Sequence, residues 1–158
     1  MKMSMRLLVS ILTMAISSSA FAAGNSDSKS LPVKAKVIAA LHLTKTADLD
    51  FGDGYVGDAA FVVNPGDTGS AGFSVTGEKS KVFSVSFSAE SVTLLRAGGT
   101  AGNAPDEVSV GTFTHDAGGS PALDGSGAKD FSVGATRADL IGKTPGDYAG
   151  SVTVTIAY

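Results

Sequence analysis

Residues 31–43 constrain the fold more than any other segment, because apolar side chains occupy every second position along it. A period of two is typical of a β-strand, whose side chains point alternately to opposite faces. Thirteen residues at about 3.3 Å each reach roughly 43 Å, about twice the usual strand length. We therefore expect either one strand that changes sheets midway, or two halves with different destinations. The alternating apolar positions are Leu31, Val33, Ala35, Val37, Ala39, Leu41 and Leu43.

Short stretches rich in Val, Thr, Ser and Phe follow, separated by turn residues. This pattern predicts an all-β fold, an antiparallel immunoglobulin-like β-sandwich in a single domain at residues 31–158. Residues 72–88 are expected to form a hairpin that turns at 77–80, and residues 138–142 a single helical turn. Further strands are predicted at 60–63, 91–95, 107–114, 130–136 and 148–158, and Gly-rich surface loops at 98–105 and 116–129.

The N-terminal 22 residues have the pattern of a secretory signal peptide. A basic start, MKMSMR, precedes an apolar stretch of roughly ten residues, and small residues stand at Ala20 and Ala22 before the expected cleavage. The apolar stretch is too short for a permanent membrane anchor, and no membrane-spanning segment is expected after it. Residues 23–30 are small and polar and predict a flexible leader. We expect an exported protein, periplasmic in transit and then at the cell surface or extracellular.

The chain contains no Cys, which excludes a disulfide scaffold, a thiol enzyme and a Cys-ligated metal site. Removing Lys2 and Arg6 with the signal peptide leaves ten basic against fifteen acidic side chains. The basic residues are not clustered, so we expect no nucleic-acid partner, because phosphate contact requires grouped Lys and Arg. Packing and backbone pairing alone must therefore hold the fold together.

The two histidines, His42 and His115, are the natural starting point for a catalytic site. Neither is accompanied by a G-x-S-x-G nucleophile motif, and two histidines fall short of a zinc site unless carboxylates complete it. We interpret both as surface or edge histidines. We expect no catalytic residues and no cofactor, so the protein is predicted not to be an enzyme.

The densest acidic group resembles a calcium-binding loop in its spacing. It lacks the full pattern, because Gly52 stands where an oxygen ligand is needed and no Glu closes the loop. We interpret these carboxylates as turn aspartates that bind local backbone N–H groups, with weak Ca²⁺ binding as the alternative. They are Asp48, Asp50, Asp53 and Asp58.

The two ends of the mature chain carry the most informative patterns. The alternating strand that reaches Tyr158 is expected to leave a sheet edge and a groove unfilled, and such an edge invites pairing with another chain. Residues 31–37 have the form of a strand that fills such a groove in a neighbouring copy. The same residues also suit a strand paired within their own domain, and the two interpretations both stay open at this point. The expected donor face is Leu31, Val33, Ala35 and Val37; the expected acceptor edge and chaperone contact is Val152, Val154, Ile156 and Tyr158.

Three segments resemble the domain-of-unknown-function family 4402, which is similar to spore-coat-U and archaic chaperone–usher pilin subunits. They are HLTKTADLDFGDGYVGD (42–58), GFSVTGEKSKVFSVSF (72–87) and PGDYAGSVTVTIAY (145–158). The resemblance implies an incomplete immunoglobulin-like sandwich, capping of its C-terminal strand by a periplasmic chaperone, and polymerisation by donated strands.

Together these patterns predict an exported structural subunit of a cell-surface pilus or fimbria-like filament. Its expected partners are copies of itself or related subunits, together with a periplasmic chaperone and an outer-membrane usher. The main alternative is a self-complete secreted β-sandwich, acting as an adhesin or matrix-binding module through the loops at 98–105 and 116–129. A secreted hydrolase that uses His42 and His115 is the third and weakest hypothesis.

Overall fold

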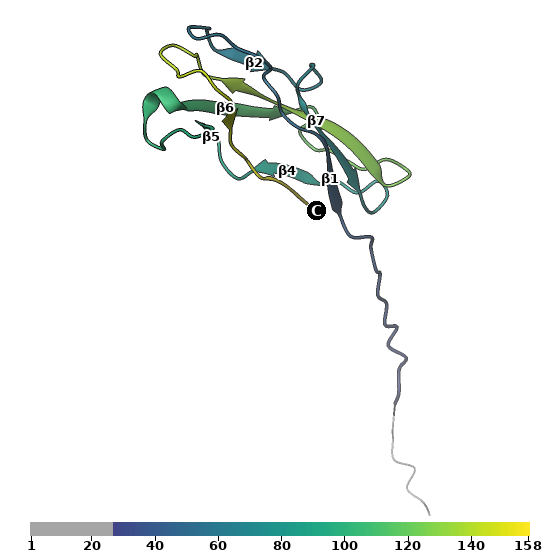
Figure 1. Ribbon diagram of the computed structural model, residues 1–158. Coiled ribbons are helices and arrows are strands. Elements are labelled where there is room, and N and C mark those ends of the chain that lie inside the picture. The colour runs from purple at the N-terminus through teal and green to yellow at the C-terminus, as the bar shows by residue number, and fades with distance from the viewer. Residues whose placement is uncertain (1–26) are drawn as a thin grey trace, which may run out of the picture. The chain divides into compact units, whose positions relative to one another are not determined.

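The computed structural model describes residues 27–158 of the chain (Figure 1). The predicted signal peptide, residues 1–22, and the first part of the leader lie outside the described residues. The chain divides into two units, residues 1–35 and 36–158. In the described part of the first unit, residues 27–35, every residue is exposed and none belongs to a strand.

The second unit is built from short antiparallel strands and a single 3₁₀ turn, η1 (Ala104–Asp106). Val, Thr, Ser and Phe dominate the strands, since these residues suit a pleated, half-buried surface. The strands are β1 (His42–Ala47), β2 (Phe61–Val63), β3 (Ala71–Thr76), β4 (Ser84–Phe87), β5 (Ser91–Arg96), β6 (Glu107–His115), β7 (Ala128–Arg137), β8 (Tyr148–Ala149) and β9 (Val154–Ala157).

Seven strands form one large antiparallel sheet in the order β1-β3-β7-β6-β5-β8, with β2 also paired to β7. Strands β3 and β2 share one edge of β7. β3 pairs from Ala71↔Val133 to Thr76↔Ala128, whereas β2 pairs from Val63↔Ala135 to Phe61↔Arg137. The long strand β7 therefore runs through the middle of the sheet and fixes the register of both neighbours.

The C-terminal segment changes sheets within a few residues. β8 joins the large sheet through Leu95↔Ala149, whereas β9 pairs with β4 in a separate two-stranded sheet through Phe87↔Val154. Gly150 lies where the chain leaves the large sheet, and a Cβ there would stand 2.9 Å from the carbonyl oxygen of Thr93. The predicted continuous strand at 148–158 is thus two short strands, and this change of sheet places a second layer over the first.

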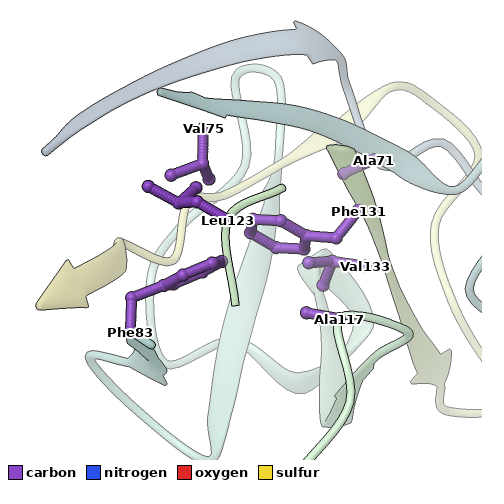
Figure 2. Close-up of a cluster of buried hydrophobic side chains, with 7 residues drawn as sticks. All are labelled: Ala71, Val75, Phe83, Ala117, Leu123, Phe131 and Val133. Atoms are coloured by element: carbon purple, nitrogen blue, oxygen red, sulfur yellow. The ribbon is translucent and has the colours of Figure 1, made fainter. Parts of the chain in front are cut away.

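The hydrophobic core lies between the two sheets (Figure 2). The inner face of the large sheet supplies Val75, Phe131 and Val133, and Phe83 precedes the small sheet. Phe73 stacks on Phe131 with ring centroids 5.3 Å apart. Burial of each large apolar side chain contributes about 1.5–3 kcal/mol of stability. The protein is an all-β antiparallel sandwich, as the sequence predicts.

Residues 116–127 contribute to this core, which corrects the prediction of a surface loop. Leu123 is 2% exposed and Ala117 6% exposed, and Figure 2 shows both side chains within the same cluster as Val75 and Phe131. Backbone hydrogen bonds hold the loop in place, from Leu123 N to Lys81 O (3.0 Å) and from Phe83 N to Pro121 O (2.9 Å). Gly-rich composition indicated a loop correctly, but two apolar side chains decide its burial.

The expected strand over residues 31–43 is wrong for most of its length, because no strand begins before His42. The first pair of β1 is His42↔Thr76, and β3 ends at Thr76. Gly77, the next residue, bonds to Gly127 O on the β7 side of β3 and has no partner among residues 27–41. Alternation gives residues 31–41 the pattern of a strand, but the described residues offer them no partner strand.

The predicted hairpin at 72–88 is also wrong. Both edges of β3 are already occupied, by β1 and by β7, so β4 pairs with β9 from the far end of the chain.

Residues 138–142 form no helical turn, contrary to the prediction. The chain makes a β-turn there, closed by a hydrogen bond from Lys143 N to Leu140 O (3.3 Å). Among residues 27–158 no helix has the length and apolarity needed to span a membrane.

Candidate strand-binding groove

The two-stranded sheet covers only part of the inner face of the large sheet, and the uncovered part is an open groove of about 1020 Å³. Small-molecule pockets usually enclose ~300–1,000 Å³, so this groove has room for an extended peptide segment. Its apolar floor comes from the inward-facing side chains of four adjacent strands. The half-buried ones, which face the open space, are Phe73 of β3, Phe113 of β6, and Val92 and Leu94 of β5; below them lie the buried Ala71 of β3, Val133 of β7, and Val108 and Val110 of β6.

Two irregular segments form the walls of the groove. One is residues 48–56, which follow β1, and the other runs through residues 143–152 to Val154 at the start of β9. The first wall is fixed to the turn that precedes β3 by a hydrogen bond from Asp50 N to Gly69 O (2.8 Å). Tyr148 holds the second, because its hydroxyl donates to the carbonyl oxygens of Thr144 (2.6 Å) and Pro105 (2.9 Å). Both walls are therefore positioned by the domain itself.

A buried arginine lies among the lining residues where β7 ends. Arg137 is 8% exposed and donates from Nη2 to the carbonyl oxygen of Ala59 at 3.3 Å. Its Nε is buried and has no hydrogen-bond partner among the described residues. An unpaired buried donor costs about 1–3 kcal/mol.

The four predicted acceptor residues take three different positions. Val152 and Val154 line the groove, whereas Ile156 packs against the hydrophobic core. Tyr158 is 43% exposed and does not line the groove. Among the described residues β9 pairs only with β4, so its second edge has no strand partner. The wall at residues 151–154 thus leads into a strand with one free edge.

All four predicted donor residues are exposed to solvent. Leu31 is 83% exposed, Val33 87% and Val37 95%, and Ala35 lies in the same exposed run. Large apolar side chains at such exposure remain available for burial against another surface. Their role as a donor face stays a prediction.

Residues 36–39, which connect the predicted donor segment to β1, are held by contacts that the sequence analysis did not identify. The Glu78 carboxylate accepts a hydrogen bond from Ala39 N at 3.1 Å and pairs with Lys36 Nζ at 3.1 Å. The Tyr158 hydroxyl accepts from Glu78 N at 2.6 Å. The Ala39 hydrogen bond, followed by that of Lys36, lowers the pKa of Glu78. We call Ala39, Glu78 and Tyr158 the root clamp. No sequence pattern links these residues, because they lie far apart along the chain.

Three of the four aspartates considered for calcium make separate local contacts. Asp48 pairs with Lys45, Asp50 accepts from Gly52 N (2.8 Å), and Asp58 accepts from Tyr55 N (2.8 Å). These bonds to nearby N–H groups are typical of turn aspartates. Within residues 27–158 no three potential ligands come together as a metal site would require.

The two histidines lie in different settings. His42 is exposed at the start of β1, whereas His115 is half-buried at the end of β6, its ring 6.2 Å from those of Phe87 and Phe131. The second setting is that of a packing residue beside the aromatic core.

Comparison with known protein families gave one match for this sandwich domain. The family described as Domain of unknown function (DUF4402) matches residues 54–158, which include the groove floor and its C-terminal wall. The chain belongs to the DUF4402 family. A search of curated proteins and a search of solved structures each gave no match. The predicted donor segment and β1 precede the range matched by the DUF4402 family.

Proposed function

We propose that this protein is an exported structural subunit of a cell-surface pilus or fimbria-like filament, assembled by β-strand donation. The groove with its apolar floor is the observation that carries the proposal. Its lining is a stretch of sandwich interior that lacks a covering strand, and sandwich interiors are otherwise close-packed. The occupant is residues 31–37 of a second copy.

The donor segment suits this groove in pattern and in polarity. Leu31, Val33, Ala35 and Val37 share one face, while Lys34 and Lys36 lie on the other. In a strand lying over the floor, the first face meets half-buried side chains such as Val92, Leu94 and Phe113, and the lysines stay in water. Main-chain bonds to the free strand edge then supply affinity, and the alternate side chains fix the register.

A free edge beside an apolar groove is hazardous during export, because it pairs with any extended chain. We therefore include the predicted chaperone and usher in the proposal. A periplasmic chaperone covers the strand of Val152, Val154, Ile156 and Tyr158 until a neighbouring copy donates its segment, and an outer-membrane usher receives the subunit. Repetition of this head-to-tail contact, which does not close on itself, gives a filament.

The adhesin alternative receives less support from the loops it requires. In the loop at 116–129, Ala117, Pro121 and Leu123 are buried, so much of it is unavailable to a ligand. In the loop at 98–105, Asp106 accepts hydrogen bonds from Thr100 N (3.2 Å) and Asn103 Nδ2 (2.8 Å), which hold the loop against η1.

Assembly of a donor-face variant tests the proposal. Val33→Asp places a charge on the donor face, and we expect the purified full-length protein to lose fibres in electron micrographs. The matched control Lys34→Asp changes the opposite face of the same segment and should still form fibres. A synthetic peptide of residues 24–37 should bind the Val33→Asp protein and raise its melting temperature. Fibre formation by Val33→Asp equal to that of the control would contradict strand donation, as would a wild-type protein that stays monomeric.

A further inference from the structure

Three large apolar side chains are exposed together at one end of the second unit. Tyr55 is 80% exposed, Val56 56% and Ile141 68%. They lie on two turns joined by paired backbone hydrogen bonds, from Gly57 N to Leu140 O (3.0 Å) and from Leu140 N to Asp58 O (2.8 Å). We call these three side chains the end patch.

Carboxylates surround the end patch and are held by the same turns. Asp58 accepts from Tyr55 N at 2.8 Å, Asp139 accepts from Ile141 N at 3.1 Å, and Asp53 stands two residues before Tyr55. The nearby positive side chains do not pair with these carboxylates. Arg137 is buried, and Lys143 donates to the carbonyl oxygen of Ala104 at 3.0 Å. The end patch is therefore apolar at its centre and acidic around it.

The root clamp lies at the opposite end of the large sheet. β7 begins at Ala128, opposite Thr76 and next to the turn that holds Glu78, and ends at Arg137, opposite Phe61. Its ten residues separate the two ends by roughly 30 Å. In Figure 1, β2 lies at one end of the domain, and the C-terminus lies beside the start of β1 at the other.

The root-clamp end has the complementary character. Lys79 is exposed there, and Lys81 Nζ lies 4.8 Å from the ring centroid of Tyr158. The two carboxylates at this end are already engaged: Glu78 by Lys36 and Ala39, and Asp124, whose carbonyl oxygen accepts from Ser80 N, by Ser126 and Ala128. Ile38, which lies two residues after Lys36 and next to Ala39 of the root clamp, is 38% exposed. One end of the domain is thus apolar and acidic, and the other is apolar and basic.

The clamp also limits how far a donated strand can lie from its own domain. Only Ile38 separates Val37, the last donor residue, from Ala39, which is held by Glu78 and Tyr158. Two residue steps span at most roughly 7 Å. A donor strand seated in a groove therefore brings the root-clamp end of its own domain against the copy that receives it.

Charge decides which end of the receiving copy is contacted. Contact with its root-clamp end would set the lysines of two copies against each other, whereas the end patch offers carboxylates and apolar surface. The groove also opens onto the end patch, since Tyr55 and Val56 line both. Like charges at close range cost binding energy, and opposite charges steer association.

We propose that the end patch is a second contact between successive copies, docking the basic root-clamp end of the copy whose strand fills the adjacent groove. This inference rests on the proposed filament function and adds a body-to-body interface to it. The tether between the two contacts is short, so the second contact forms at high effective concentration once the strand is seated. This second contact favours a straight and regular filament over one in which successive domains are joined flexibly by the donated strand alone.

Charge exchange in the full-length protein tests this interface. In Asp139→Lys/Ile141→Lys we expect assembly at low salt to slow about tenfold and the fibres to bend more in electron micrographs. Lys79→Glu alone should slow assembly as well. A one-to-one mixture should restore alternating contacts and part of the rate, and the three changes combined in one chain should restore more. Asp130→Lys, on the outer face of β7, carries the same charge change as Asp139→Lys by itself and serves as the control for that half of the double variant.

Failure of this contact can be distinguished from failure of strand donation. In the Val33→Asp background, which lacks donation, sedimentation of the full-length protein at high concentration should show weak, salt-sensitive self-association. Ile141→Lys should abolish that association, whereas Asp130→Lys should not. Unchanged sedimentation with Ile141→Lys, or charge reversals that slow assembly no more than the control, would overturn the end patch as an interface. Loss of fibres with Val33→Asp alone concerns donation only.

Discussion

The hydroxyl of Tyr158 donates a hydrogen bond to the carbonyl oxygen of Ala39, 3.2 Å away, across a sequence separation of 119 residues. The same hydroxyl accepts from Glu78 N at 2.6 Å, so one side chain beyond β9 holds the turn after β3 and the segment before β1. In the proposed filament, this bond connects the strand that borders the groove with the segment that fills the next one.

Removal of this hydroxyl should loosen the connecting segment without unfolding the domain. In Tyr158→Phe the two hydrogen bonds disappear, and we expect the free energy of unfolding to fall by about 1 kcal/mol. Hydrogen exchange at residues 36–41 should accelerate, because Ala39 and Glu78 lose a shared partner. Tyr55→Phe is the matched control, since the Tyr55 hydroxyl makes no hydrogen bond within the described residues. Equal exchange in the two variants would show that the root clamp does not hold this segment.

The stability of the domain should fall with acidification over a defined range. Asp124 Oδ1 accepts hydrogen bonds from Ser126 Oγ (2.6 Å), Ala128 N (2.9 Å) and Ser126 N (2.8 Å). These bonds lower the pKa of Asp124 from 3.8 to about 2. Because the folded-state pKa lies below the unfolded one, the ionised carboxylate stabilises the fold above pH 3.8, and this contribution is lost as the pH falls toward 2.

Urea unfolding between pH 7 and pH 2 measures this dependence. We expect Asp124→Asn to flatten the curve between pH 4 and pH 2 and to lower stability at neutral pH. Asp130→Asn, an exposed carboxylate on the outer face of β7, is the control. A slope for Asp124→Asn as steep as that of the wild type would assign the acid sensitivity to other carboxylates.

Gly134 is required by the close approach of β7 to the chain that follows β2. A Cβ at Gly134 would collide with the carbonyl oxygen of Val63 and lie 2.8 Å from Pro65 N. Both neighbours are backbone atoms that cannot rotate away, so Gly134→Ala should destabilise by about 1–3 kcal/mol. At Gly119 an added Cβ meets nothing within 4 Å, and Gly119→Ala should change the midpoint of urea unfolding little. Similar midpoints for the two variants would refute the collision.

Leu123 should contribute more to the free energy of unfolding than its position in a Gly-rich loop indicates. It is 2% exposed and packs within the core cluster, so Leu123→Ala leaves a cavity and should cost about 2–5 kcal/mol in urea unfolding. Ile141→Ala removes an exposed side chain and should stay within about 0.5 kcal/mol of the wild type. A Leu123→Ala loss as small as that of Ile141→Ala would mean that the loop is not part of the core.

Local sequence patterns predicted most of the strands. The alternating residues at 107–114 and 130–136 lie within β6 and β7, and residues 91–95 lie within β5. Period two and β-branched residues specify an extended backbone and an inner face, which is enough to predict an antiparallel sandwich. The apolar floor of the groove follows from the same alternation, because Val108 and Val110 point to one side of β6.

Which strands pair with each other, and which side chains become buried, depends on segments far away in the sequence. No local pattern near residues 72–88 indicates that β3 pairs with β1 and β7, or that β4 pairs with β9. Likewise, no local signal separates Leu123, which is buried, from Ile141, which is exposed. Both the pairing of a strand and the burial of a side chain depend on which distant segment of the chain packs against it.

The sequence by itself therefore determined an all-β domain, its strand faces and the alternating apolar pattern of the segment before β1, whereas the structure showed that segment to be exposed. Only the tertiary structure decided that the chain changes sheets after Ala149, that a groove stays open over β5, β6 and β7, and that Tyr158 holds Ala39. The physical reason is that alternation is a local property of the backbone, whereas pairing and burial depend on contacts between residues far apart in the chain.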